Sequence, residues 1–265
     1  KPSEVVVVSN GQITNVASDT LIRNEKLEGG NLRAAYDKGN LQLKGEVRVG
    51  GLPGQIEVRL DAKGAGEASL SAVLDQAARQ KRGINLPGTS GPLQLRLTKA
   101  LGDKADNSLR VEADLARASI DGLLPGWTKP AGKAGKLSFM LDTDKDGTDL
   151  DDFVLESGPV LLKGKVSLGK AMAFESASFT SAKLSPGDDL RIDLSVDGGV
   201  TKAIVRGKVF DARPFLKLDG KDNKSEPDFD LDLNVPILTG FNSEALGNAV
   251  VKLSRRQGDF RNLIL

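Results

Sequence analysis

The chain has 265 residues, of which 39% are hydrophobic but only 4% aromatic, and 30 are glycine. Its 37 basic and 36 acidic residues give a net charge of +1, so there is no strong positive field to attract nucleic acid. Cysteine and histidine are absent, which excludes Ser-His and Cys-His nucleophiles, thiolate or imidazole metal sites and disulfides. We therefore expect a protein that is not an enzyme, uses no cofactor or metal, and does not bind nucleic acid.

The two ends of the sequence favour a segment of a longer protein. The chain starts at Lys1 without Met and stops in the apolar sequence FRNLIL. Its longest apolar runs, such as residues 5–8, are far shorter than the roughly 20 residues that span a bilayer. We expect any membrane anchor or signal to lie outside this segment.

Alternation of apolar and polar residues is the dominant pattern along the chain. Turn sequences such as GGLPG at 50–54 and SPGDD at 185–189 separate the alternating runs. Such alternation is typical of antiparallel sheets with one apolar and one solvated face. The apolar positions that we expect on that face are Leu41, Leu43, Gly45, Val47, Val49, Ile56, Val58, Leu60, Leu93, Leu95, Leu97, Leu109, Val111, Leu115, Leu137, Phe139, Leu141, Leu162, Gly164, Val166, Leu168, Leu190, Ile192, Leu194, Val196, Val205, Gly207, Val209, Phe229, Leu231, Leu233 and Val235.

In chain order, a first β section is predicted over 1–66 and a helix over 67–82. The helix is predicted because Leu70, Val73 and Leu74 recur at helical spacing and Gly83 follows as a C-cap. A central β section over 83–217, a mobile polar loop over 218–228 and a final β section over 229–265 complete the chain, with a short second helix near Ser243. The predicted fold is mostly β: a long curved antiparallel sheet forming an open, taco-like groove with one amphipathic helix.

A glycine stands among the apolar positions of three expected strands. Gly45, Gly164 and Gly207 each keep the apolar parity and are flanked by Lys, Glu or Arg on the other parity. Glycine weakens a strand interior, so each needs a compensating reason. One interpretation is a curvature device on the concave side of a rolled sheet. The alternative is a closed sandwich in which a large neighbouring side chain packs against each glycine.

An ordered series of segments resembles one protein family. LDQAARQKRGINLPGTSGPLQLRL, NSLRVEADLARASIDGLLPGWTKPAGKAGKLSF, LDDFVLESGPVLLKGKVSL, FTSAKLSPGDDLRI and VRGKVFDARPFL, within residues 40–217, resemble the AsmA-like envelope proteins of Gram-negative bacteria, specifically the YhdP-type central region, which is related to TamB. The resemblance implies a non-enzymatic β-groove in the periplasm, anchored in the inner membrane by a segment outside this chain. It also implies transport of phospholipid toward the outer membrane, as in bridge-like lipid transfer proteins.

The residues themselves suit such a ligand, because an aliphatic surface without buried charge can bind acyl chains. Each buried CH₂ contributes about 0.8 kcal/mol, and no single contact dominates the binding. The expected partner is therefore phospholipid. The alternative function is a structural or protein-interaction β module without lipid, whose strand edges pair with outer-membrane or envelope proteins.

Three other features admit a functional and a structural interpretation. Asp142, Asp144 and Asp146 match the start of a calcium loop, but position twelve is Phe153, so a hairpin turn is favoured. Trp127 is interpreted as a plug over a core rather than a membrane contact. The basic residues at 79–82 are expected to complement the helix dipole rather than bind lipid phosphate.

Overall fold

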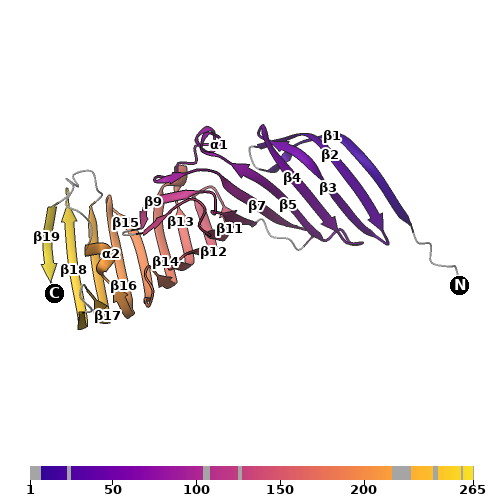
Figure 1. The fold of residues 1–265 in the computed structure, drawn as a ribbon. Helices are drawn as coiled ribbons and strands as arrows, with labels where there is room; N and C mark the ends of the chain where they lie inside the picture. Colours follow the sequence, from indigo (N-terminus) through magenta and orange to yellow (C-terminus); the bar gives the residue numbers. More distant parts are fainter. Residues whose placement is uncertain are drawn as a thin grey trace. The chain divides into compact units, whose positions relative to one another are not determined.

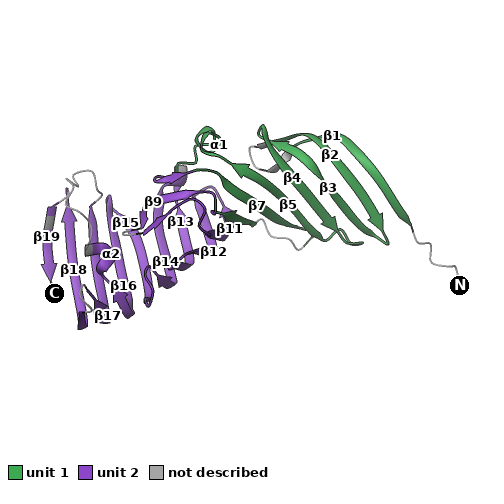
Figure 2. Ribbon diagram, viewed as in Figure 1, with its two compact units in different colours: residues 1–85, 91–114 green, residues 86–90, 115–265 purple. Residues whose placement is uncertain are grey.

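The computed structural model describes residues 7–22, 25–103, 108–124, 127–216, 228–240, 244–257 and 259–264. Among these residues, sixteen strands lie side by side in chain order in one open sheet, and three short strands form a second sheet. The helices are few and short (Figure 1). The predicted mostly β fold with one large sheet is confirmed. The chain divides into two compact units, residues 1–85 with 91–114 and residues 86–90 with 115–265 (Figure 2).

Unit 1 is an antiparallel sheet in which each strand pairs with the next along the chain. Its core is a cluster of aliphatic side chains on one face of β2 to β5, centred on Leu32, Val47 and Ile56. The elements of unit 1 are β1 (Val8–Ile22), β2 (Glu25–Asp37), β3 (Asn40–Val49), β4 (Leu52–Leu60), β5 (Gly66–Leu74), α1 (Gln76–Lys81), β7 (Leu93–Leu101) and β8 (Leu109–Asp114).

The helix predicted over 67–82 is largely wrong, because its first half is the strand β5. β5 pairs with β4 on one side and β7 on the other, and a sheet interior satisfies its backbone as fully as a helix would. Leu70 and Leu74 are buried on one face, whereas Val73 is 46% exposed on the other, as a period of two requires. The helix begins only after Asp75, whose side chain accepts a hydrogen bond from the Ala78 N–H at 2.8 Å.

Unit 2 combines nine strands of the large sheet with the small three-stranded sheet, whose order is β10-β9-β6. Its elements are β6 (Thr89–Ser90), β9 (Ser119–Leu124), β10 (Trp127–Lys129), β11 (Lys136–Thr143), β12 (Thr148–Ser157), β13 (Val160–Leu168), the 3-10 helix η1 (Lys170–Met172), β14 (Phe174–Lys183), β15 (Asp189–Asp197), β16 (Val200–Asp211), α2 (Arg213–Leu216), β17 (Phe229–Thr239), β18 (Ala245–Arg256) and β19 (Asp259–Ile264).

The sheet of unit 2 departs from the predicted antiparallel pattern at one pair, since β16 and β17 are parallel. Parallel neighbours need a long crossover, and the described part of the connection after β16 begins with α2. The loop predicted over 218–228 lies, except for Asp228, outside the described residues. The start of the second helix predicted near Ser243 also lies outside them, and the following residues from Ala245 form β18 instead.

Candidate apolar binding face

Strand pairing brings the predicted apolar positions together on one face of each unit. In unit 1, Gly45 pairs with Ile56, which pairs with Leu70. In unit 2, Ile192 pairs with Val205, which pairs with Leu233. These ladders form continuous aliphatic rows that run across the strands. The structure therefore assembles the predicted set into a surface, whereas its occupation by lipid stays a prediction.

Two members of the predicted set depart from these rows. Leu115 is buried but lies outside the strands, where its N–H donates to the Gly135 carbonyl at 2.9 Å. Val209 pairs with Asp189 just beyond a register shift, and Phe210 is the buried residue there. A bulge moves one extra residue into a strand, so alternation alone places such residues wrongly.

The apolar face of unit 1 is mostly buried toward one end of the strands and half-buried toward the other, and Leu43, Val58 and Leu97 at the less buried end still pack against the core. We call the two ends the closed half, formed by Val47, Val49, Ile56, Leu70, Leu74, Leu93 and Val111, and the open half, formed by Leu41, Leu43, Val58, Leu60, Leu97 and Leu109. Part of the face is thus a packed core, and part remains accessible to a ligand.

The short helix α1 and the loop after it lie at the closed half of unit 1. Arg79 is 2% exposed and donates to the carbonyl of Gly91 at 2.7 Å. Arg82 donates to the carbonyls of Val49 and Gly50 at 3.2 and 3.0 Å. These arginines satisfy backbone groups at strand ends, which supports the structural interpretation over phosphate binding.

Unit 2 repeats the gradient along β15. On β15, Leu190 is 2% exposed, Ile192 8% and Val196 41%, with Leu194 half-buried between them. On β17, Leu233 and Val235 are buried, and exposure rises toward both ends of the strand, to half-buried Leu231 on one side and to Ile237, which is 43% exposed, on the other. The closed half of unit 2 is formed by Leu155, Val160, Leu162, Ala182, Leu190, Ile192, Val205, Phe210, Leu233 and Val235, and the open half by Leu150, Leu168, Phe174, Leu194, Val196, Phe229 and Leu231.

Buried hydrogen bonds connect loop and strand backbone at the closed half of unit 2. The buried carboxylate of Asp188 accepts hydrogen bonds from the backbone N–H groups of Leu184, Ser185 and Asp211 at 3.0, 2.7 and 2.8 Å. Burial raises the pKa of Asp188, and these three donors oppose that rise. α2 follows directly, and its Phe215 ring packs 5.1 Å from that of Phe210.

The three motif glycines make room for the backbone of a neighbouring strand. A Cβ at Gly45 would lie 2.0 Å from the carbonyl oxygen of Asn31, and one at Gly164 would lie 1.9 Å from that of Ser178. At Gly207 the corresponding distance, to the Asp189 oxygen, is 2.1 Å. Register shifts occur at or close to each of these pairs. Close backbone approach beside bulges, rather than crowding between side chains, therefore accounts for the glycines.

Aromatic residues pair with one of these glycines on both neighbouring strands. Gly164 pairs with Phe153 on β12 and with Phe179 on β14, and the two rings meet 5.8 Å apart. Phe139 stacks on Phe153 at 6.4 Å. Large side chains thus lie on the strands either side of Gly164, although the sheet is open and not the closed sandwich of the alternative prediction.

The apolar faces carry charged residues, although a lipid-binding surface was expected to have none. Pairing places Lys99 beside Ala68 in unit 1 and Arg255 beside Phe229 in unit 2. Both residues lie near the open halves and are half-buried, and the Nε atom of Arg255 is itself buried.

The opposite face of each unit is polar and carries many of the ion pairs. The Gln42 amide and the Arg59 guanidinium donate to Glu57 and lower the pKa of its carboxyl group. Ser167 and Lys165 do the same for Asp149. Exposed pairs of this kind contribute little to stability but keep the face hydrated and anionic groups ionised.

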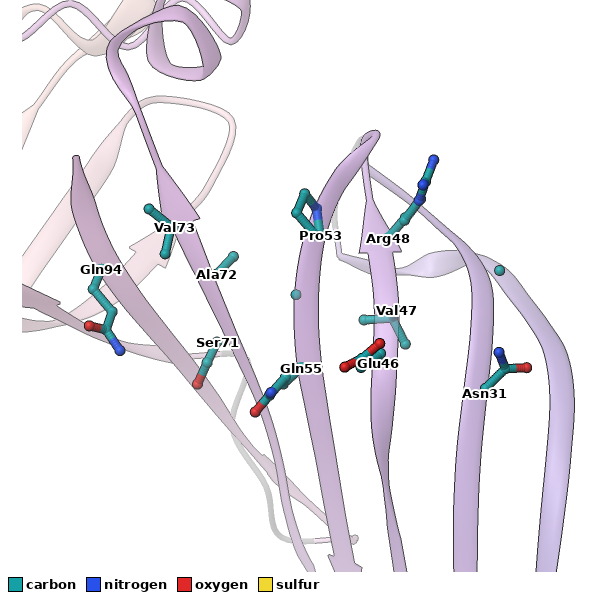
Figure 3. A pocket seen from close by; sticks show the side chains of 12 residues that line it. Asn31, Glu46, Val47, Arg48, Pro53, Gln55, Ser71, Ala72, Val73 and Gln94 are labelled. Carbon is teal, nitrogen blue, oxygen red and sulfur yellow. The ribbon is translucent and has the colours of Figure 1, made fainter. Parts of the chain in front are cut away.

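The polar face of unit 1 is also hollowed, which the sequence analysis did not predict. A hollow of about 560 Å³ lies over β2, β3, β4, β5 and β7 (Figure 3). Exposed Glu46, Arg48 and Gln55 line it. No local signal marks it, because such polar residues alternate along every strand. Its charges are mixed and solvated, so it shows no preference for one ligand class.

The structure favours a structural role for the Asp-rich turn and for Trp127. Residues 144–147 form the turn between β11 and β12, in which Asp144 accepts from the N–H groups of Asp146 and Gly147. Among the described residues, no group of three or more acidic side chains is placed to hold a metal ion. Trp127 is buried, as expected for a plug. No described helix is long and apolar enough to cross a membrane.

Comparisons with protein-family models, curated proteins and solved structures give no match. The resemblance to AsmA-like proteins therefore stays a prediction.

Proposed function

We propose that this chain binds phospholipid acyl chains on the open halves of its two apolar faces, as part of a longer cell-envelope protein that moves lipid between the inner and outer membranes. The observation that carries the proposal is the graded exposure of each aliphatic face. A protein core alone would be buried along the whole length of its strands, whereas here the apolar side chains of β3 and β15 become more exposed toward one end of each strand.

The chemistry of the open halves fits a hydrocarbon ligand. Leu, Val and Ala side chains there present apolar surface, and covering it with a flexible tail releases water at about 25 cal/mol per Å². The aliphatic side chains of these rows make no strong directional contact that would fix one position of an acyl chain. A chain held in this way can slide, which suits transport better than storage. The sequence resemblance to AsmA-like proteins points to the same cargo.

A photo-crosslinking scan tests the proposal. Benzoylphenylalanine placed at Leu43 or Leu60, on the open half, should crosslink to phospholipid when the protein is irradiated with phospholipid vesicles in the absence of detergent. The same probe at Gln42 or Arg59, one residue away on the opposite face of the same strands, should not. Equal crosslinking from both faces, or none from either, would contradict a specific apolar site.

A further inference from the structure

On the strands β3, β4, β5, β7 and β8 of unit 1, the apolar face carries one charged residue, Lys99. No shift of register occurs between β5 and β7, so Lys99 lies beside Ala68 and on the same side as Leu97 and Leu101. The other charged residues of these strands, such as Lys44 and Arg96, have the opposite parity. A single cation on an otherwise aliphatic face is unusual enough to need a reason.

Lys99 is the last residue of a row of paired side chains whose other members are all aliphatic. Ala34, Leu43, Val58 and Ala68 pair in turn across β2, β3, β4 and β5, and Lys99 follows on β7. All five side chains are half-buried. At roughly 4.8 Å between neighbouring strands, the row extends over about 19 Å, a length comparable to that of an extended long-chain acyl tail.

The ammonium of Lys99 has no ion pair with another described residue. Lys99 is half-buried, and a lysine beside apolar surface packs its stem on that surface while its ammonium reaches water. A hydrocarbon row that ends in one positive charge is complementary to an amphiphile with one negative charge.

We infer that the open half of unit 1 selects anionic phospholipid, with the lipid phosphate at Lys99 and an acyl chain along the row. The inference rests on the proposed function and narrows its substrate class. A zwitterionic headgroup brings its own cation near Lys99, so it gains less from the same contact than phosphatidylglycerol does.

The test incubates the delipidated full chain with vesicles of equal phosphatidylglycerol and phosphatidylcholine bearing identical acyl chains, and quantifies the bound lipids by mass spectrometry. The parent should retain about fivefold more phosphatidylglycerol. Lys99→Gln should lower this ratio toward one, and Lys99→Arg should keep it. Arg96→Gln, on the opposite face of the same strand, is the matched control and should also keep it.

Equal retention of both lipids by the parent, or an unchanged ratio in Lys99→Gln, overturns the anionic selectivity and leaves the proposed lipid binding in place. If the parent retains neither lipid, both the selectivity and the proposed function fail. Circular dichroism of each variant confirms that lost selectivity does not come from unfolding.

Discussion

At the scale of single residues, Gly164 shows how a missing side chain permits a strand pair. It lies at a register shift between β13 and β14, where the Ser178 carbonyl oxygen occupies the position of a Cβ. The rings of Phe153 and Phe179, which pair with it on the two neighbouring strands, lie 5.8 Å apart. The sequence indicated that this glycine faced the apolar side, but the bulge that requires it involves Thr180 on another strand, which local patterning does not reveal.

Replacing this glycine should be costly. Gly164→Ala should destabilise the chain by about 2 kcal/mol or more, because the backbone of β14 must move to admit a Cβ. Gly247→Ala is the control, since no atom lies within 4 Å of the corresponding Cβ, and it should change stability by less than about 0.5 kcal/mol. Urea unfolding measures both, and equal effects would show that the close approach is unimportant.

At the scale of elements, alternation predicted the strands well where one face is buried. Residues 41–49 and 190–196 form β3 and β15 much as expected. The helix over 67–82 failed because Leu70 and Leu74 satisfy a period of two and a period of four alike, and pairing with β4 and β7 decided between them. The parallel pair of β16 and β17 was not predictable, since strand direction depends on the crossover rather than on either strand.

The sequence pattern also did not predict how deeply each apolar residue is buried. Alternation tells which face a residue occupies, but not whether that part of the face is covered. Val47 and Leu43 have the same parity on β3, yet Val47 is buried and Leu43 is half-exposed. The candidate lipid-lining residues were therefore predicted as one class, whereas the structure divides them into a core and an accessible surface.

This division predicts different responses to a charge on one strand. Val47→Asp should unfold unit 1 or destabilise it by at least about 3 kcal/mol, because the carboxylate loses its water in the closed half. Leu43→Asp should cost less, about 1 kcal/mol, and leave a folded circular-dichroism spectrum, because its carboxylate remains solvated. Equal destabilisation by the two substitutions would mean that the face is a core throughout.

At the scale of the whole molecule, each unit has the same design. The large sheet presents a charged, hydrated face and an aliphatic face, and the latter is more buried toward one end of strands such as β3 and β15. Such a surface gains stability from a flexible apolar ligand without needing a second protein layer. Each unit by itself thus offers an accessible aliphatic surface, and this is the reason that we favour lipid binding over a purely structural module.

The most direct test is mass spectrometry of organic extracts from the purified parent, from Leu194→Asp on the open half of unit 2, and from Ile204→Asp on the opposite face of the adjacent strand. Leu194 is half-buried and Ile204 is 45% exposed, so both variants should fold. We predict phospholipid with the parent and Ile204→Asp, but at least about tenfold less with Leu194→Asp. Equal recovery from all three proteins, or none from the parent, would contradict lipid binding on the apolar face.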